Sequence, residues 1–187
     1  EVMGGPSACC GIVYSKWEGD LKKGGRVSEQ TLQRFGEFTP QKVLSWCPSC
    51  QIHLGETIKG YREVAFDFDH ITQFLLEHEA ELIGRFTTPV NERVVVHTHR
   101  GLPEVGQAVL RLLRAIPGLT VVAEAEEPGY MCGASGSDRS PELKAHVRQD
   151  TLALCRQNNV DALVSLFHGC HLQLSKEGHT HGFRVTN

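Results

Sequence analysis

The chain has 187 residues, enough for one large domain or two small ones, and a formal net charge of −3. Acidic and basic residues are mixed along it, so the charge gives no electrostatic reason to expect nucleic acid or an anionic membrane as a partner. No apolar run approaches the roughly 20 residues of a membrane span, and no signal peptide is visible.

The seven cysteines are an odd number, with one vicinal pair and one Cys-x-x-Cys, and ten histidines accompany them. This pattern does not fit the disulfide framework of a secreted domain. In a reducing cytosol such cysteines more often serve metal or redox chemistry. We therefore expect a cytoplasmic protein whose cysteines bind a metal or take part in a redox reaction.

Taken in chain order, strand-like apolar stretches alternate with segments of helical periodicity. This alternation predicts an α/β fold with mainly parallel strands flanked by helices. Because sites in parallel sheets form at the carboxyl ends of the strands, the motif loops are expected to converge there. The predicted elements are a loop at 4–8, a loop at 19–26, a helix from Ser28 as N-cap to about Phe35, a strand at 43–46, a helix to about Lys59, a helix at 71–82, a strand at 93–97, a helix at 103–116, a strand at 119–123, a loop at 129–136, a helix from Pro141 to about Gln157 and a strand at 162–167.

Four cysteines form the sharpest motif of the chain. The strand at 43–46 runs into Cys47-Pro48-Ser49-Cys50, and Cys9 and Cys10 precede it in Cys9-Cys10-Gly11. The start of a helix favours thiolate, and four thiolates from two loops suit a soft metal or an iron–sulfur cluster. A vicinal pair is unusual for tetrahedral zinc. Two alternatives are buried cysteines with a chance Cys-x-x-Cys, and a thioredoxin-like dithiol of Cys47 and Cys50.

A second stretch repeats this arrangement in degraded form. Met131-Cys132-Gly133 corresponds to the Cys-Cys-Gly motif, and after a similar spacing the chain continues into 167–174. In this alignment Phe167 stands where the first cysteine of the Cys-x-x-Cys would be, and Leu174 matches Leu54. The sequence therefore predicts an internal duplication whose second copy has lost cysteines.

A mixed Cys/His site is the corresponding hypothesis for the second copy. Imidazole and thiolate both suit zinc or a mononuclear iron ion. The alternative is a vestigial pocket with hydrogen-bonded histidines, and another register of the repeat would align two of these histidines, His168 and His171, with the Cys-x-x-Cys. The candidate metal ligands are Cys132, Cys170, His97, His99, His168 and His171.

Three further features are expected to have structural rather than functional roles. Cys155 falls at core spacing inside a predicted helix, which favours packing over function. His179 and His181 in Gly-His-Thr-His-Gly are expected in a solvated loop rather than at a metal. Asp67 and Asp69 are expected in a turn that enters a helix rather than as a catalytic pair.

Together these motifs resemble the cysteine-rich CCG domains of heterodisulfide reductase subunits B and D, with relatives in glycolate oxidase and lactate utilisation iron–sulfur subunits. The residues that carry the resemblance are Cys9-Cys10-Gly11, Cys47-Pro48-Ser49-Cys50, the stretch 113–119, Cys132-Gly133 and the stretch 170–174. It implies two tandem modules, at 1–88 and 89–187. The first is expected to be incomplete at its N-terminal side, and the second to be degenerate.

The resemblance also implies a function. The first module would hold a noncubane [4Fe-4S] cluster on Cys9, Cys10, Cys47 and Cys50, with an upstream cysteine outside this chain, and the second would hold no cluster. The expected protein is an iron–sulfur subunit of a heterodisulfide reductase-like complex that receives electrons from partner subunits and passes them to a disulfide or related sulfur substrate. The alternative is a non-catalytic zinc-binding or scaffold subunit that kept the fold and lost the clusters.

Overall fold

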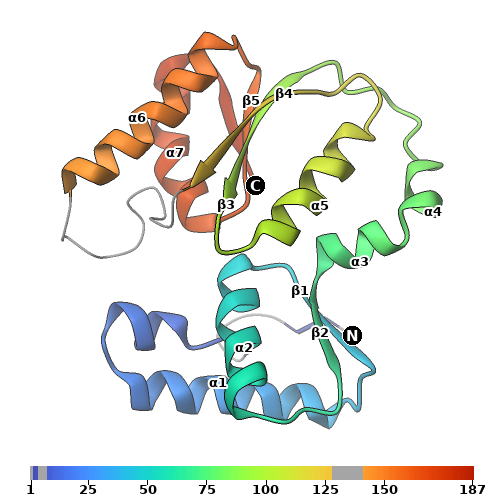
Figure 1. Cartoon of the computed structure of the whole chain (residues 1–187), viewed down its shortest axis with the longest axis vertical. Coiled ribbons are helices and arrows are strands. Elements are labelled where there is room, and N and C mark those ends of the chain that lie inside the picture. The colour runs from blue at the N-terminus through green and yellow to red at the C-terminus, as the bar shows by residue number, and fades with distance from the viewer. Residues whose placement is uncertain (1, 4–7, 128–140) are drawn as a thin grey trace. The chain divides into compact units, whose positions relative to one another are not determined.

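The computed structural model describes residues 2–3, 8–127 and 141–187. The chain divides into two compact units, Glu1–Ile71 and Thr72–Asn187 (Figure 1). Both are built from parallel strands flanked by helices, which confirms the predicted α/β class. No helix in the described ranges is long and apolar enough to cross a membrane.

The first unit is a small α/β layer. Strand β1 pairs in parallel with β2, in a register that runs from Lys42↔Asp67 to Ser45↔His70. Between them α2 makes the crossover, and α1 precedes β1. Its elements are a π-helical turn at Val13–Trp17, α1 at Leu21–Glu37, β1 at Lys42–Ser45, α2 at Pro48–Tyr61 and β2 at Asp67–His70.

The core of this unit joins the cysteine loop to its helices. Cys10, Leu32 of α1 and Leu54 of α2 form its buried centre. Phe35 and Phe66 add an edge-to-face aromatic pair, with ring centroids 6.2 Å apart. One of the motif cysteines is therefore part of the hydrophobic core, and packing fixes its position.

The second unit is a four-stranded parallel sheet in the order β4-β3-β5-β6. Helices α6 and α7 lie on one side of it and α5 on the other (Figure 1). Valine and alanine side chains of the central strands pack with a valine and a leucine of α5 to form a buried core. Its elements are α3 at Ile71–Glu77, α4 at Glu79–Ile83, β3 at Arg93–His99, α5 at Pro103–Arg114, β4 at Thr120–Glu127, α6 at Pro141–Gln157, β5 at Ala162–Ser165, α7 at His168–His181 and β6 at Arg184–Thr186.

The internal duplication is visible in the elements. Helices α1 and α6 both have 17 residues, and α2 and α7 both have 14. The same interval separates the two members of each pair, and it also separates β1 from β5. The turn before each of these strands contains a left-handed residue, Thr39 at φ 45° and Asn159 at φ 47°. The two halves therefore repeat one strand–helix–strand pattern with a preceding helix.

The predicted loop at 19–26 is wrong, because α1 already begins at Leu21. Asp20 caps it, accepting a hydrogen bond from the Lys23 backbone N–H at 2.9 Å. The Gly24-Gly25 pair has low helix propensity, but close packing requires Gly24: a Cβ there would lie 1.8 Å from Ser15 Oγ. The predicted N-cap, Ser28, is consequently a buried residue inside the helix.

Three smaller expectations also fail. The predicted helix at 71–82 is two short helices, α3 and α4, in which no residue is buried. Asp67 and Asp69 belong to strand β2 rather than to a turn. His179 and His181 lie in the last turn of α7, because the helix continues to Gly182, whose φ of 79° ends it in a left-handed C-cap.

Candidate functional site

Cys47 and Cys50 lie at the junction of β1 and α2, as predicted. Cys47 is the N-cap of α2 and Pro48 follows at the first helical position, where its fixed φ suits a helix start. The Gln51 backbone N–H donates to the Cys47 carbonyl at 2.9 Å. Ser45 Oγ donates to Gln51 Oε1 at 2.6 Å and ties the strand end to the first helical turn. Both cysteines therefore sit at the positive end of the helix dipole.

Cys10 completes a cluster of three thiols. Cys50 hydrogen-bonds to both Cys10 and Cys47, and all three are free thiols. The hydrogen bond from Cys50 lowers the pKa of Cys10, while burial opposes this shift. The pKa of Cys50 is raised, because its hydrogen bonds to Cys10 and Cys47 are made by the protonated thiol. The cluster thus favours thiolate at Cys10 and thiol at Cys50.

Cys9 belongs to the same loop. Its sulfur accepts a hydrogen bond from the Gly11 backbone N–H at 3.4 Å. Gly11 has φ +79°, and a Cβ on it would lie 2.4 Å from the Gly24 carbonyl oxygen. The loop therefore rests directly on the backbone of α1, and only glycine allows this approach. The four predicted ligands of the first module thus lie on two neighbouring segments, with Cys9 and Cys10 on one and Cys47 and Cys50 on the other.

Two functional candidates on α1 were missed from the sequence. Thr31 Oγ1 donates to the Cys9 carbonyl and Ser28 Oγ donates to the Cys10 carbonyl, both at 2.6 Å. The sequence pattern predicts Ser28 as a helix cap and gives no role to Thr31. The available signal was the spacing, because hydroxyls three residues apart share one face of a helix.

Soft donors make this site suitable for a metal or an iron–sulfur cluster. Cys10, Cys47 and Cys50 offer sulfur atoms that already contact one another through hydrogen bonds, which metal–thiolate bonds would replace. Within the described ranges, no group of three or more His, Cys, Asp or Glu side chains is arranged as a ready metal site. The three sulfur atoms are chemically suited to bind a soft metal. In this structure they hydrogen-bond to one another.

A cavity of about 520 Å³ opens beside Cys47 and Cys50. Its walls are mostly apolar and come entirely from the first unit. Trp46 lines it with 70% of its surface exposed. The other apolar and aromatic lining residues are Val2, Met3, Ala8, Phe35, Phe38, Pro40, Val43, Leu44, Leu54, Phe68 and Ile71. A ligand in this cavity would face two thiols.

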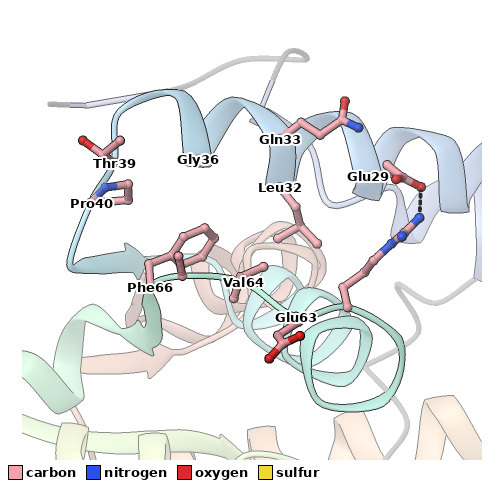
Figure 2. Close-up of a pocket in the computed structure, with 11 residues that line it drawn as sticks. Glu29, Leu32, Gln33, Gly36, Thr39, Pro40, Glu63, Val64 and Phe66 are labelled. Carbon is pink, nitrogen blue, oxygen red and sulfur yellow. Dashed lines mark hydrogen bonds and ion pairs between the residues drawn. The ribbon is translucent and has the colours of Figure 1, made fainter.

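A second cavity, of about 430 Å³, lies between α1 and the segment 62–66 (Figure 2). The ion pair of Glu29 and Arg62 lies at one end of it, and Thr39 and Pro40 lie at the other. Leu32, Val64 and Phe66 give it an apolar wall. The residues that line this cavity include none of the candidate cysteines.

In the second module a phenyl group replaces a thiol. Phe167 is the N-cap of α7, as Cys47 is of α2, and it is 2% exposed. Its ring packs against His99 with centroids 4.8 Å apart. Cys170 is the third residue of α7, as Cys50 is of α2, and is fully buried. The register that aligns Phe167 with the first cysteine of the motif therefore agrees with the structure.

Two of the four candidate histidines of the second module lie close to each other. The rings of His168 and His171 have centroids 6.0 Å apart at the start of α7. His97 is buried on β3, where it is opposite Ser165 of β5. His171 Nδ1 is buried without a hydrogen-bond partner in the part of the chain that the structure describes. The remaining predicted ligand, Cys132, and its neighbours Met131 and Gly133 lie outside the described residues.

Comparison with known proteins agrees with this duplicated architecture. The family model described as a cysteine-rich domain (CCG) matches residues 2–55 and 96–175, together more than half of the chain. The two ranges cover both modules, and the first includes all four cysteines of the candidate site. No curated protein matches the chain. The family match is consistent with an iron–sulfur-related subunit. The chain belongs to the CCG cysteine-rich domain family.

Proposed function

We propose that this chain is an iron–sulfur subunit of a heterodisulfide reductase-like complex in the cytoplasm. The observation that carries the proposal is the meeting of Cys10, Cys47 and Cys50 at the start of α2, in a chain of the CCG family. Other subunits of the complex would supply electrons, and a disulfide or related sulfur compound would accept them.

The residues that would hold a [4Fe-4S] cluster of the noncubane type are Cys9, Cys10, Cys47 and Cys50. When bound, such a cluster supplies one-electron transfer. The chain itself provides the thiolates, and the start of α2 stabilises their negative charge. Burial of Cys10, at 2% exposure, keeps water from one side of the site.

The cavity beside Cys47 and Cys50 is the proposed substrate site. Its apolar walls suit the carbon skeleton of a sulfur-containing small molecule, whose sulfur atoms would then lie near Cys47 and Cys50. Exclusion of water by Phe68 and Leu54 would strengthen electrostatic interactions at the reacting sulfur.

The second module is proposed to hold no iron–sulfur cluster. Phe167 fills with apolar volume the position that corresponds to a cluster cysteine. Cys132, Cys170 and the neighbouring histidines would at most bind one zinc or mononuclear iron ion. The second module then contributes the fold and surfaces for partner subunits.

Reconstitution tests the proposal. The protein is incubated anaerobically with iron and sulfide, and its iron, zinc and acid-labile sulfide contents and its visible spectrum are measured. We expect about four iron and about four sulfide ions per chain, lost in Cys10→Ala and Cys50→Ala. Cys155→Ala removes a buried thiol outside the site and is the matched control. Zinc without sulfide in the wild type would instead support a scaffold subunit.

The cysteines of the second module give a further control. Replacing Cys132 and Cys170 together by serine should leave the sulfide content unchanged. A loss of half of the sulfide in this double variant would contradict the assignment of the cluster to the first module alone.

A further inference from the structure

Helix α1 buries an unusual set of side chains. A helix that packs on a core normally buries an apolar stripe, but the buried residues of α1 are Gly24, Ser28, Thr31 and Leu32. Only the last of these is a large apolar residue. Ser28 is 2% exposed and Thr31 is 1% exposed. Burying a hydroxyl costs free energy unless it is hydrogen-bonded. The hydrogen-bond partners of Ser28 and Thr31 therefore indicate what these residues do.

Both partners are carbonyls of the vicinal cysteines. Ser28 Oγ lies 2.6 Å from the Cys10 carbonyl oxygen, and Thr31 Oγ1 lies 2.6 Å from the Cys9 carbonyl oxygen. Water cannot take over these hydrogen bonds without opening the core, because the hydroxyls are almost inaccessible. The orientation of the Cys9 and Cys10 peptide groups is therefore held from α1.

Peptide orientation decides where the sulfur atoms point. Cys10 hydrogen-bonds to Cys50 at the start of α2, and the hydrogen bond from Ser28 to the Cys10 carbonyl restrains the backbone from which this side chain projects. Gly11, the next residue, is already pressed against the Gly24 backbone. The loop is thus held by close packing at Gly11 and by hydrogen bonds from Ser28 and Thr31.

The duplication distinguishes the role of the Ser28 hydroxyl from that of the helix that carries it. Position Thr31 of α1 corresponds to Thr151 of α6, which is also buried, but Ser28 corresponds to Arg148. Arg148 instead forms an ion pair with Glu177 at 3.5 Å. The Ser28 hydroxyl is therefore missing from the module in which Phe167 has replaced the first cysteine of the Cys-x-x-Cys. A helix of this length in this fold does not itself need a serine there.

We infer that Ser28 and Thr31 are positioning residues of the thiol site, which aim Cys10 and Cys9 at the metal centre by holding their backbone carbonyls. The inference rests on the proposed function for the nature of that centre. Groups that orient metal ligands typically change metal affinity by about 10- to 100-fold when they are removed. The hydroxyls act through the cysteines and would not touch the cluster or the substrate.

The test compares Ser28→Ala, Thr31→Val and the conservative Thr31→Ser with the wild type after reconstitution. We expect Ser28→Ala and Thr31→Val to lose iron to a chelator about 10-fold faster and to show an altered cluster spectrum. Thr31→Ser keeps the donor and should restore the wild-type rate. Thr151→Val makes the same change in the second module and should leave both the rate and the spectrum unchanged.

Cluster-free protein gives a second measurement that does not depend on the nature of the metal. Because the Cys10 loop loses a support, alkylation of Cys10, followed by mass spectrometry of its peptide, should be faster in Ser28→Ala than in the wild type. Equal Cys10 alkylation in the two proteins would overturn the inference, as would an equal effect of Thr151→Val on iron loss. Failure of the wild type to take up a cluster would refute the proposed function alone.

Discussion

Phe167 and Cys47 occupy the same backbone position in the two modules. Each is the N-cap of a 14-residue helix, with φ −101° and ψ 117° at Cys47 and φ −99° and ψ 127° at Phe167. The backbone has kept its path while a thiol at one copy of the position has become a buried phenyl group at the other. The second module can therefore be studied as a version of the first in which a buried apolar side chain stands where the first has a thiol.

Truncation of this phenyl group should destabilise the protein without affecting the cluster proposed for the first module. Phe167→Ala would leave a cavity at a side chain that is 2% exposed, and we expect a loss of about 3–5 kcal/mol in the free energy of unfolding of the second unit. Chemical denaturation measures this loss, and iron and sulfide analysis should match the wild type. Leu172→Ala, on the same helix and 53% exposed, is the control and should change little.

The two adjacent glycines of α1 should respond in opposite directions to alanine. At Gly24 a Cβ would lie 2.9 Å from the backbone nitrogen of Ser15, so Gly24→Ala should destabilise the first unit by more than about 1 kcal/mol. At Gly25 nothing lies within 4 Å of the added Cβ. Gly25→Ala should therefore stabilise the helix by about 0.5–1 kcal/mol. Equal effects of the two changes on the denaturation midpoint would contradict the packing described for Gly24.

The first unit should lose stability in mildly acidic solution. Burial lowers the pKa of His70 from its ordinary value of 6.5, and burial together with the charge of Lys16 lowers that of His53. Above pH 6.5 both histidines are neutral in the folded and unfolded states. Below it the unfolded chain binds protons that the folded chain does not, so stability falls with pH until the lowered pKa values are reached.

The contribution of His70 to this pH dependence can be measured separately. Each such histidine contributes at most about 1.4 kcal/mol per pH unit. His70→Gln should make the unfolding free energy depend less steeply on pH just below 6.5, because burial lowers the pKa of His70 in the folded protein. An unchanged slope in His70→Gln would mean that another group titrates.

Alkylation of protein prepared without added iron or sulfide should rank its thiols by accessibility. Cys47 is half-buried and lines the larger cavity at the start of α2, so we expect it to react early. Cys155 and Cys170 are fully buried, and burial raises the pKa of Cys155 to about 11. At pH 8 these two thiols should react last in a mass-spectrometric time course. Early modification of Cys155 would show that α6 opens more readily than its packing indicates.

The sequence was sufficient for elements with a clear periodicity and for the junction of β1 and α2. Tertiary packing did not override the sequence pattern of three elements, namely the strands at 93–97 and 162–167 and the helix from Pro103. The start of α1 could not be predicted, because glycine in a helix is disfavoured locally. Only the tertiary contact of Gly24 with Ser15 explains why it is there.

The thiols of the candidate site could be predicted from the sequence, but the residues that hydrogen-bond to the cysteine loop could not. Cys-Cys-Gly and Cys-x-x-Cys are visible as spacings, and the strand-to-helix junction places Cys47 and Cys50. Ser28 and Thr31 hydrogen-bond to backbone carbonyls 18 and 22 positions away in sequence. A serine or threonine does not indicate from its type whether it caps a helix or reaches a distant loop, so their role depends on the folded structure.

Thr39 has a consequence for engineering of the first unit. At φ 45° it is a β-branched residue in a left-handed turn, where its counterpart in the second unit is Asn159. Asparagine and glycine tolerate this conformation, whereas β-branched residues are strained in it. Replacing Thr39 by a residue that tolerates this conformation should therefore increase the stability of the turn between α1 and β1. A Thr39→Asn background would give material that better withstands the destabilising substitutions needed to probe the thiol site.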